Sequence, residues 1–243
     1  MRFLLLLILL TILSEKTLAS NECAKLSKNP LKIYYDVDIA QPVVDHSMTS
    51  AQLTQKRKGS INEWNKNNQM QSGGLLESLF GSTQSVGGMT TVKHNLGLKY
   101  KTHGRSLGKY GDLKCPVFSY VDLNLKYHGT IFIPREYKKD GCAYNAIFNH
   151  EMEHYVIGAE NLHKLSKTVR KNLPALTDKL SQDMGVVGRT QLTGAREMMA
   201  DNLYEIIRGV FQETKQKTAK ESAAIDTPEE YADVQAQLDA CAD

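Results

Sequence analysis

The run His-Glu-Met-Glu-His at residues 150–154 most constrains the fold of this chain, because it sets two histidines four residues apart. In an α-helix residues i and i+4 lie on the same face, so His150 and His154 can bind one metal ion together. Glu151 then projects beside them. Two imidazoles, an adjacent carboxylate and an open position for water are typical of a hydrolytic zinc site. We therefore expect a helix that binds one zinc ion per chain; the alternative is a charged surface helix with solvated histidines.

A second pair of residues downstream predicts a third ligand. Glu197 and Asp201 are also four residues apart and share one helical face. Apolar residues with helical spacing follow the same segment: Met198, Met199, Leu203, Ile206, Ile207 and Val210. At the edge of such a buried face, a carboxylate is costly unless it is paired or bound to a metal. Glu197 as a zinc ligand would remove this cost, and Asp201 could accept the outward ring N–H of a ligating histidine. The alternative is that both are ordinary surface acids.

Together the two motifs resemble the gluzincin metallopeptidases, in which His-Glu-x-x-His is followed by a later helix with a glutamate ligand. The resemblance covers two helices and rests on residues 150–154 and on Glu-Met-Met-Ala-Asp at 197–201. It implies zinc ligation by His150, His154 and Glu197. It also implies Glu151 as the general base and Asp201 as the acid that supports a zinc-binding histidine.

The segment before the motif carries a second resemblance. From Cys115 to His150 its apolar runs are similar to those of an uncharacterised group of predicted bacterial secreted zinc proteases. In zincins the strand before the metal-binding helix edges the cleft and pairs with an extended peptide. The resemblance therefore implies that residues 119–133 have this role.

Other residues near the motif are weaker candidates for ligands. His163 follows His154 by nine residues, about half a turn out of phase on a continuous helix. Glu160 is also off the face shared by the two histidines, and we expect Glu153 at the surface. The metzincin pattern requires glycine and histidine where this chain has Ile157 and Glu160, so that pattern is absent.

The beginning of the sequence predicts a secretory signal peptide over residues 1–19. Arg2 supplies a positive charge, residues 3–13 are almost entirely apolar, and Thr17-Leu18-Ala19 offers small residues for cleavage. The apolar run is too short for a comfortable membrane span, although an uncleaved anchor is the alternative. We expect an exported protein, periplasmic or extracellular, with no stable membrane span after the signal is removed.

All four cysteines lie beyond this signal, and an even number in an exported chain indicates disulfides. The pairing we favour joins Cys115 to Cys142 and Cys23 to Cys241. The first bond would staple a strand region to the zinc-binding helix, and the second would tie the two ends together. The other two connectivities stay open. No Cys-x-x-Cys spacing supports a zinc site made of cysteines.

Periodicity along the chain predicts strands first and helices afterwards, which indicates an α+β fold. The expected strands are at 32–39 and within 90–98 and 113–133, and a first helix is expected at 50–64. Later helices are expected at about 143–170, from Pro174 to about Met184, from beyond Gly188 through Glu197 and past Phe211, and at 228–241. Pro174 predicts the break between the first two of these helices. Thr227 and Pro228 predict the start of the last one. Residues 72–89 mix glycine pairs with bulky apolar side chains, so we expect an irregular loop, with a lid over the site as the alternative.

This layout predicts one domain over residues 20–243, strand-rich at 30–134 and helical at 143–241. By resemblance it is zincin-like, with an antiparallel or mixed sheet followed by the metal-binding helix and the glutamate-ligand helix. The implied function is a secreted zinc endopeptidase that acts on a protein or peptide. The alternatives are a zinc amidase of cell-wall peptides and a secreted binding protein with an inherited metal site. The net charge is only +3, and no nucleic-acid module is present. We expect the cationic run at 99–114 to be a solvated hairpin, with binding to an acidic surface as the alternative.

Overall fold

A computed structural model describes residues 23, 31–67, 87–107 and 112–241. The expected signal peptide and most of the glycine-rich segment at 72–89 lie outside these ranges. Within them, no helix is long and apolar enough to cross a membrane.

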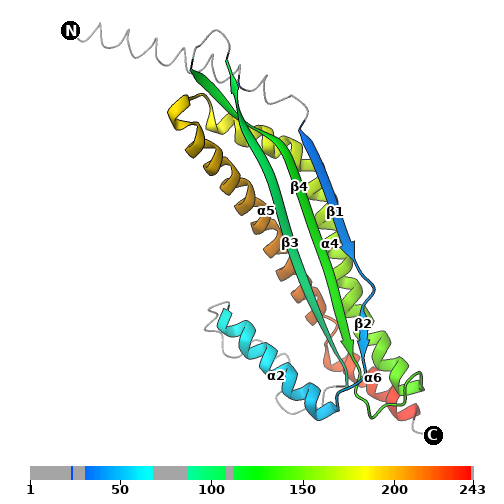
Figure 1. The fold of residues 1–243 in the computed structure, drawn as a ribbon. Helices are drawn as coiled ribbons and strands as arrows, with labels where there is room; N and C mark the ends of the chain where they lie inside the picture. Colours follow the sequence, from blue (N-terminus) through cyan, green and yellow to red (C-terminus); the bar gives the residue numbers. More distant parts are fainter. Residues whose placement is uncertain (1–22, 24–30, 68–86, 108–111, 242–243) are drawn as a thin grey trace. The chain divides into compact units, whose positions relative to one another are not determined.

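The described residues form a mixed α/β fold with a five-stranded sheet and four α-helices (Figure 1). In chain order the elements are β1 (Lys32–Ile39), β2 (Val43–Asp45), α2 (Ser50–Asn67), β3 (Met89–Ser106), β4 (Leu113–Phe132), α4 (Cys142–Met184), β5 (Val187–Gly188), the 3-10 helix η2 (Arg189–Gln191), α5 (Leu192–Ala223) and α6 (Pro228–Ala240). The prediction of an α+β fold is confirmed at this level.

Strand β4 is the centre of the sheet and pairs with each of the other four strands. Its side chains alternate as expected: Val121, Leu123 and Leu125 are buried, whereas the residues between them are half-buried. β2 runs parallel to the end of β4, with Val43 opposite Thr130. Because β4 has strand neighbours, the expectation that residues 119–133 form the free edge of a cleft is wrong.

The chain divides into two compact units. Unit 1 takes its described residues from 1–38, 95–125 and 163–213, and unit 2 from 39–94, 126–162 and 214–243. The long elements β3, β4, α4 and α5 each contribute residues to both units.

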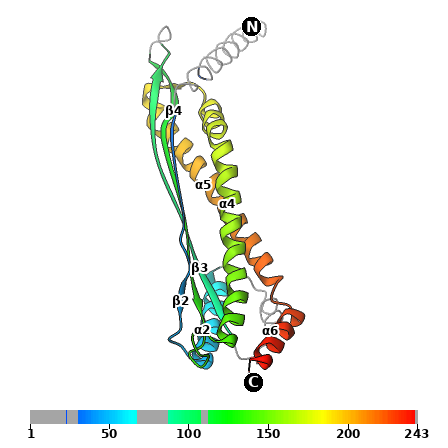
Figure 2. The same cartoon turned by 90° about the vertical axis from the view of Figure 1, so that its right-hand side faces the viewer.

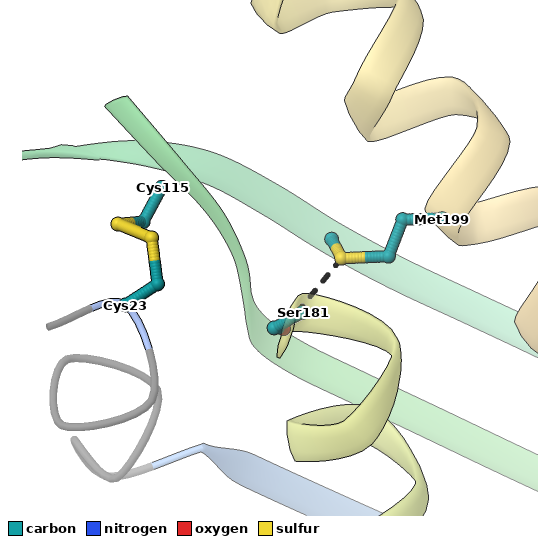
Figure 3. Close-up of a disulfide and its surroundings, with 4 residues drawn as sticks. All are labelled: Cys23, Cys115, Ser181 and Met199. Carbon is teal, nitrogen blue, oxygen red and sulfur yellow. Dashed lines mark hydrogen bonds between the residues drawn. A yellow bond between two sulfur atoms is a disulfide. The ribbon is translucent and has the colours of Figure 1, made fainter. Parts of the chain in front are cut away.

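Unit 1 contains a disulfide between Cys23 and Cys115 (Figure 3). Both cysteines are buried in an apolar cluster with Leu107 and Val117. Nearby, the Ser181 hydroxyl on α4 lies 3.6 Å from the sulfur of Met199 on α5 (Figure 3).

Helix α4 runs through Pro174 without the expected break. Proline removes one helical hydrogen bond, but buried side chains on either side hold the helix in place. Leu173 and Leu180 are both buried. The Thr177 hydroxyl also donates to the carbonyls of Leu173 and Pro174, at 3.0 and 2.8 Å.

Unit 2 is built around a cluster of Ile131, Ile133, Tyr144 and Ile147, against which Leu238 of α6 packs. A disulfide between Cys142 and Cys241 ties the end of α6 to the beginning of α4, and the two helices lie side by side there (Figure 2). Helix α6 begins as its sequence predicts, because the Thr227 hydroxyl accepts a hydrogen bond from the backbone N–H of Glu230.

The expectation that all four cysteines form disulfides is confirmed, but the favoured pairing is wrong. Cys115 pairs with Cys23 rather than with Cys142, and Cys142 pairs with Cys241. The favoured pairing requires Cys23 to meet Cys241. Instead Cys23 bonds within unit 1 and Cys241 bonds within unit 2, so each disulfide lies within one unit. Two disulfides indicate an oxidising compartment.

Candidate metal centre

The two histidines of the motif lie on α4 in unit 2 and face an aspartate from the turn between α5 and α6. His150 Nε2 lies 3.4 Å from Oδ1 of Asp226, and His154 Nε2 lies 3.1 Å from the same oxygen. The centroids of the two imidazole rings are 5.0 Å apart, and the rings are nearly perpendicular. All three side chains are only 12–13% exposed. Among the described residues, these three form the group whose atoms lie close enough together to hold a metal ion.

The spacing of the three ligand atoms fits a metal site. Zinc binds nitrogen and oxygen ligands at about 2.0–2.1 Å in a tetrahedral arrangement, which sets neighbouring ligand atoms about 3.3 Å apart. The nitrogen–oxygen distances of 3.1 and 3.4 Å lie on either side of this value. The same contacts also fit hydrogen bonds from the ring N–H groups to Asp226 Oδ1, because a neutral imidazole has one N–H donor and one acceptor nitrogen. A metal ion bound to these three atoms would take the place of those protons.

The turn after α5 delivers Asp226 to this position. The backbone N–H of Asp226 donates to the carbonyl of Ala223 at 3.3 Å, which closes the chain at the end of α5. On the first turn of α6, the hydroxyl of Tyr231 donates to Asp226 Oδ1 at 3.1 Å. Burial raises the pKa of Tyr231 to about 12, so this hydroxyl stays protonated and remains a donor.

His154 has a partner at each ring nitrogen. Its Nε2 faces Asp226, and its Nδ1 lies 2.7 Å from the hydroxyl oxygen of Ser222 near the end of α5. For Nε2 to bind a metal, the ring proton must be on Nδ1, where Ser222 would accept it.

Glu151 is the most deeply buried acid of the site, at 5% exposure. The Thr90 hydroxyl donates to its backbone carbonyl at 2.8 Å. Gly88 packs so closely that a Cβ there would lie 2.8 Å from the Glu151 carboxylate. Burial raises the pKa of Glu151, although the charge of His154 opposes this effect. A carboxyl group with a raised pKa suits a general base.

The protonation states of the centre follow from its contacts. The hydrogen bond to Asp226 raises the pKa of His150 despite the burial of the ring. Burial of Asp226 would raise its pKa, but hydrogen bonds from His150 and His154 outweigh burial and hold the pKa below its usual range. Without a metal, the centre therefore contains an ionised Asp226 and a readily protonated His150.

The structure does not bring Glu197 or Asp201 into this group. Both belong to unit 1, near the beginning of α5, and both are exposed. The burial argument for them is wrong, because the buried side of α5 carries Met199, Leu203, Ile207 and Phe211, whereas Met198, Ile206 and Val210 are exposed. The ligand role of Glu197 and the supporting role of Asp201 stay predictions that this arrangement does not favour.

Of the other candidates, Glu153 and His163 are exposed, as expected, and Glu160 is exposed as well. Sequence reasoning missed Asp226, Ser222 and Tyr231. Thr227 and Pro228 predict the start of α6, and Asp226 immediately precedes Thr227. No local spacing connects that residue to the motif, because 72 residues separate it from His154.

No protein-family model, curated protein or solved structure matches the chain. The chemistry of the centre must therefore be argued from its own residues.

Proposed function

We propose that the protein is a zinc-dependent peptidase whose metal is held by His150, His154 and Asp226. The supporting observation is the convergence of two imidazole nitrogens and one carboxylate oxygen at ligand spacing. Two nitrogens and one oxygen from the protein leave a fourth position open for water, as in catalytic zinc sites. In this proposal Asp226 takes the place that the resemblance gave to Glu197.

Bound zinc would supply an activated water and polarise the scissile carbonyl. Glu151 follows His150 directly, and its carboxyl group is influenced by the charges of both histidines and of Asp226. It would accept the proton of that water and pass it to the leaving amine. The Tyr231 hydroxyl orients the Asp226 carboxylate through its hydrogen bond.

The proposed substrate is a protein or peptide in the oxidising compartment that the disulfides indicate, and the protein would reach it by export. A zinc amidase of cell-wall peptides would use the same ligands. A binding protein would not need a buried carboxylate beside the metal, so the position of Glu151 favours hydrolysis.

Elemental analysis of the purified mature protein and of its His150→Ala and Glu151→Gln variants tests whether the protein binds zinc at this centre. We expect about one zinc per wild-type chain, loss of zinc in His150→Ala, and retention in Glu151→Gln. Cleavage of labelled casein should be lost in both variants. Wild-type protein that binds no zinc after refolding with the ion would overturn the proposal. Zinc binding without casein cleavage would direct the search to cell-wall peptides.

A further inference from the structure

We infer that Ser222 is a positioning residue for the metal ligand His154, and that a polar network around the buried side chain of Asn161 holds Ser222 in place. This inference rests on the proposed function, because it concerns how one ligand of that centre is oriented. Ser222 makes its contact with the ring nitrogen that faces away from Asp226.

The contact between Ser222 and His154 selects one tautomer of the ring. The hydroxyl oxygen lies 2.7 Å from Nδ1, on the opposite side of the ring from Nε2 and Asp226. When Nδ1 donates to this oxygen, Nε2 keeps its lone pair free for a metal. The same bond fixes the rotation of the ring, so Nε2 points towards Asp226 and the proposed metal position rather than in other directions.

Asn161 bonds α4 to α5 seven residues, or two helical turns, after His154. Its side chain is buried, at 3% exposure. The amide nitrogen donates to Thr218 at 3.2 Å and to the carboxylate of Glu221, and the amide oxygen accepts from Lys217 at 2.8 Å. Lys217 and Glu221 also form an ion pair at 3.2 Å.

This network sits in the turn of α5 that directly precedes Ser222. Glu221 and Thr218 are one and four residues before it, so bonds to Asn161 fix both the rotation and the axial position of α5 at this point. Both helix segments belong to unit 2. A buried amide with all its groups bonded is costly to replace by a residue that leaves its partners unpaired. Asn161 therefore acts through α5 and Ser222 on the orientation of His154.

The test measures zinc affinity by chelator competition and the thermal stability of the metal-free protein. Ser222→Ala should weaken zinc binding by about 10- to 100-fold, the usual effect of losing such an outer partner. Ser222→Thr keeps the hydroxyl and should restore most of the affinity. Asn161→Leu should weaken binding in the same direction as Ser222→Ala.

Ser181 provides a control outside unit 2, because it is a buried serine on α4 in unit 1 that is bonded to Met199, whereas Ser222 is half-buried. Ser181→Ala should change stability without changing zinc affinity. Nitrogen-15 NMR of the zinc-bound wild type gives an independent reading that needs no variant. It should show a slowly exchanging N–H proton on His154 Nδ1, and faster exchange in Ser222→Ala.

The outcomes separate the two proposals. Failure of the wild type to bind zinc overturns the proposed function. Zinc binding by the wild type, with unchanged affinity in Ser222→Ala, overturns the role of Ser222 alone. If Ser222→Ala does not fold, the wild-type spectrum decides: a rapidly exchanging Nδ1 proton overturns the inference, and a protected one supports it.

Discussion

His154 Nε2 lies 3.1 Å from Oδ1 of Asp226, although 72 residues separate them in the chain. This contact closes the group of ligand atoms and makes Asp226 the third ligand in our proposal. Asp226→Asn keeps the size of the side chain and removes its charge. We expect zinc affinity to fall by more than about 100-fold, a larger loss than for an outer partner of a ligand. Chelator competition measures it.

Glu197→Gln is the matched control, since it changes an exposed acid of α5 in the same way. It should leave zinc affinity unchanged. If Glu197→Gln loses zinc and Asp226→Asn retains it, the ligand assignment reverts to the one that the sequence resemblance implied.

Zinc binding should release protons and weaken in acid. The hydrogen bond to Asp226 raises the pKa of His150 above its ordinary value near 6.5, so the metal-free ring stays protonated to a higher pH than a free histidine. Below that pKa zinc must displace the proton, and affinity should fall by about tenfold per pH unit for each proton released. Titration calorimetry at pH 6.5, in two buffers that differ in ionisation enthalpy, counts the protons. An enthalpy that does not depend on the buffer would contradict the prediction.

Gly88 controls the space around the proposed base. A Cβ at this position would lie 2.5 Å from Ile147 and 2.8 Å from the Glu151 side chain, so Gly88→Ala must displace one of them. We expect a loss of about 1–3 kcal/mol in the free energy of unfolding, as for other overpacked cores. Displacement of Glu151 should also lower peptidase activity far more than zinc affinity. Thermal unfolding, casein cleavage and chelator competition measure the three effects.

Gly209 offers the opposite case, because nothing lies within 4 Å of a Cβ placed there on α5. Gly209→Ala should stabilise the protein by up to about 1 kcal/mol through helix propensity, with activity unchanged. Equal effects of the two substitutions would show that Gly88 does not crowd Glu151.

Local patterns predicted the elements well. The alternation of the buried residues Val121, Leu123 and Leu125 predicts a strand at β4. Thr227 followed by Pro228 predicts the start of α6. Both signals depend on neighbours within a few residues. The same holds for His150 and His154, which one helical turn brings together.

Asp226 was not predictable in this way, because its place depends on α5 and α6 meeting α4 over long sequence distances. The prediction of Glu197 as a ligand depends on a buried face that includes Met198 and Ile206. Helix α5 is rotated so that both are exposed. A helix with apolar residues on two sides does not reveal which side it buries, and only tertiary packing decides this.

The two disulfides provide a final test, because they close loops of similar length in different units. Cys142–Cys241 spans 99 residues and Cys23–Cys115 spans 92, so a chain-entropy model gives each a similar stabilisation of about 4–5 kcal/mol. Only the first anchors α6, which carries Tyr231 and begins two residues after Asp226. A Cys142→Ser/Cys241→Ser double variant should therefore lose both stability and zinc affinity. A Cys23→Ser/Cys115→Ser double variant should lose stability to a similar extent and keep its zinc affinity. Thermal unfolding and chelator competition on both variants measure this, and equal zinc affinities would show that the anchoring of α6 does not position Asp226.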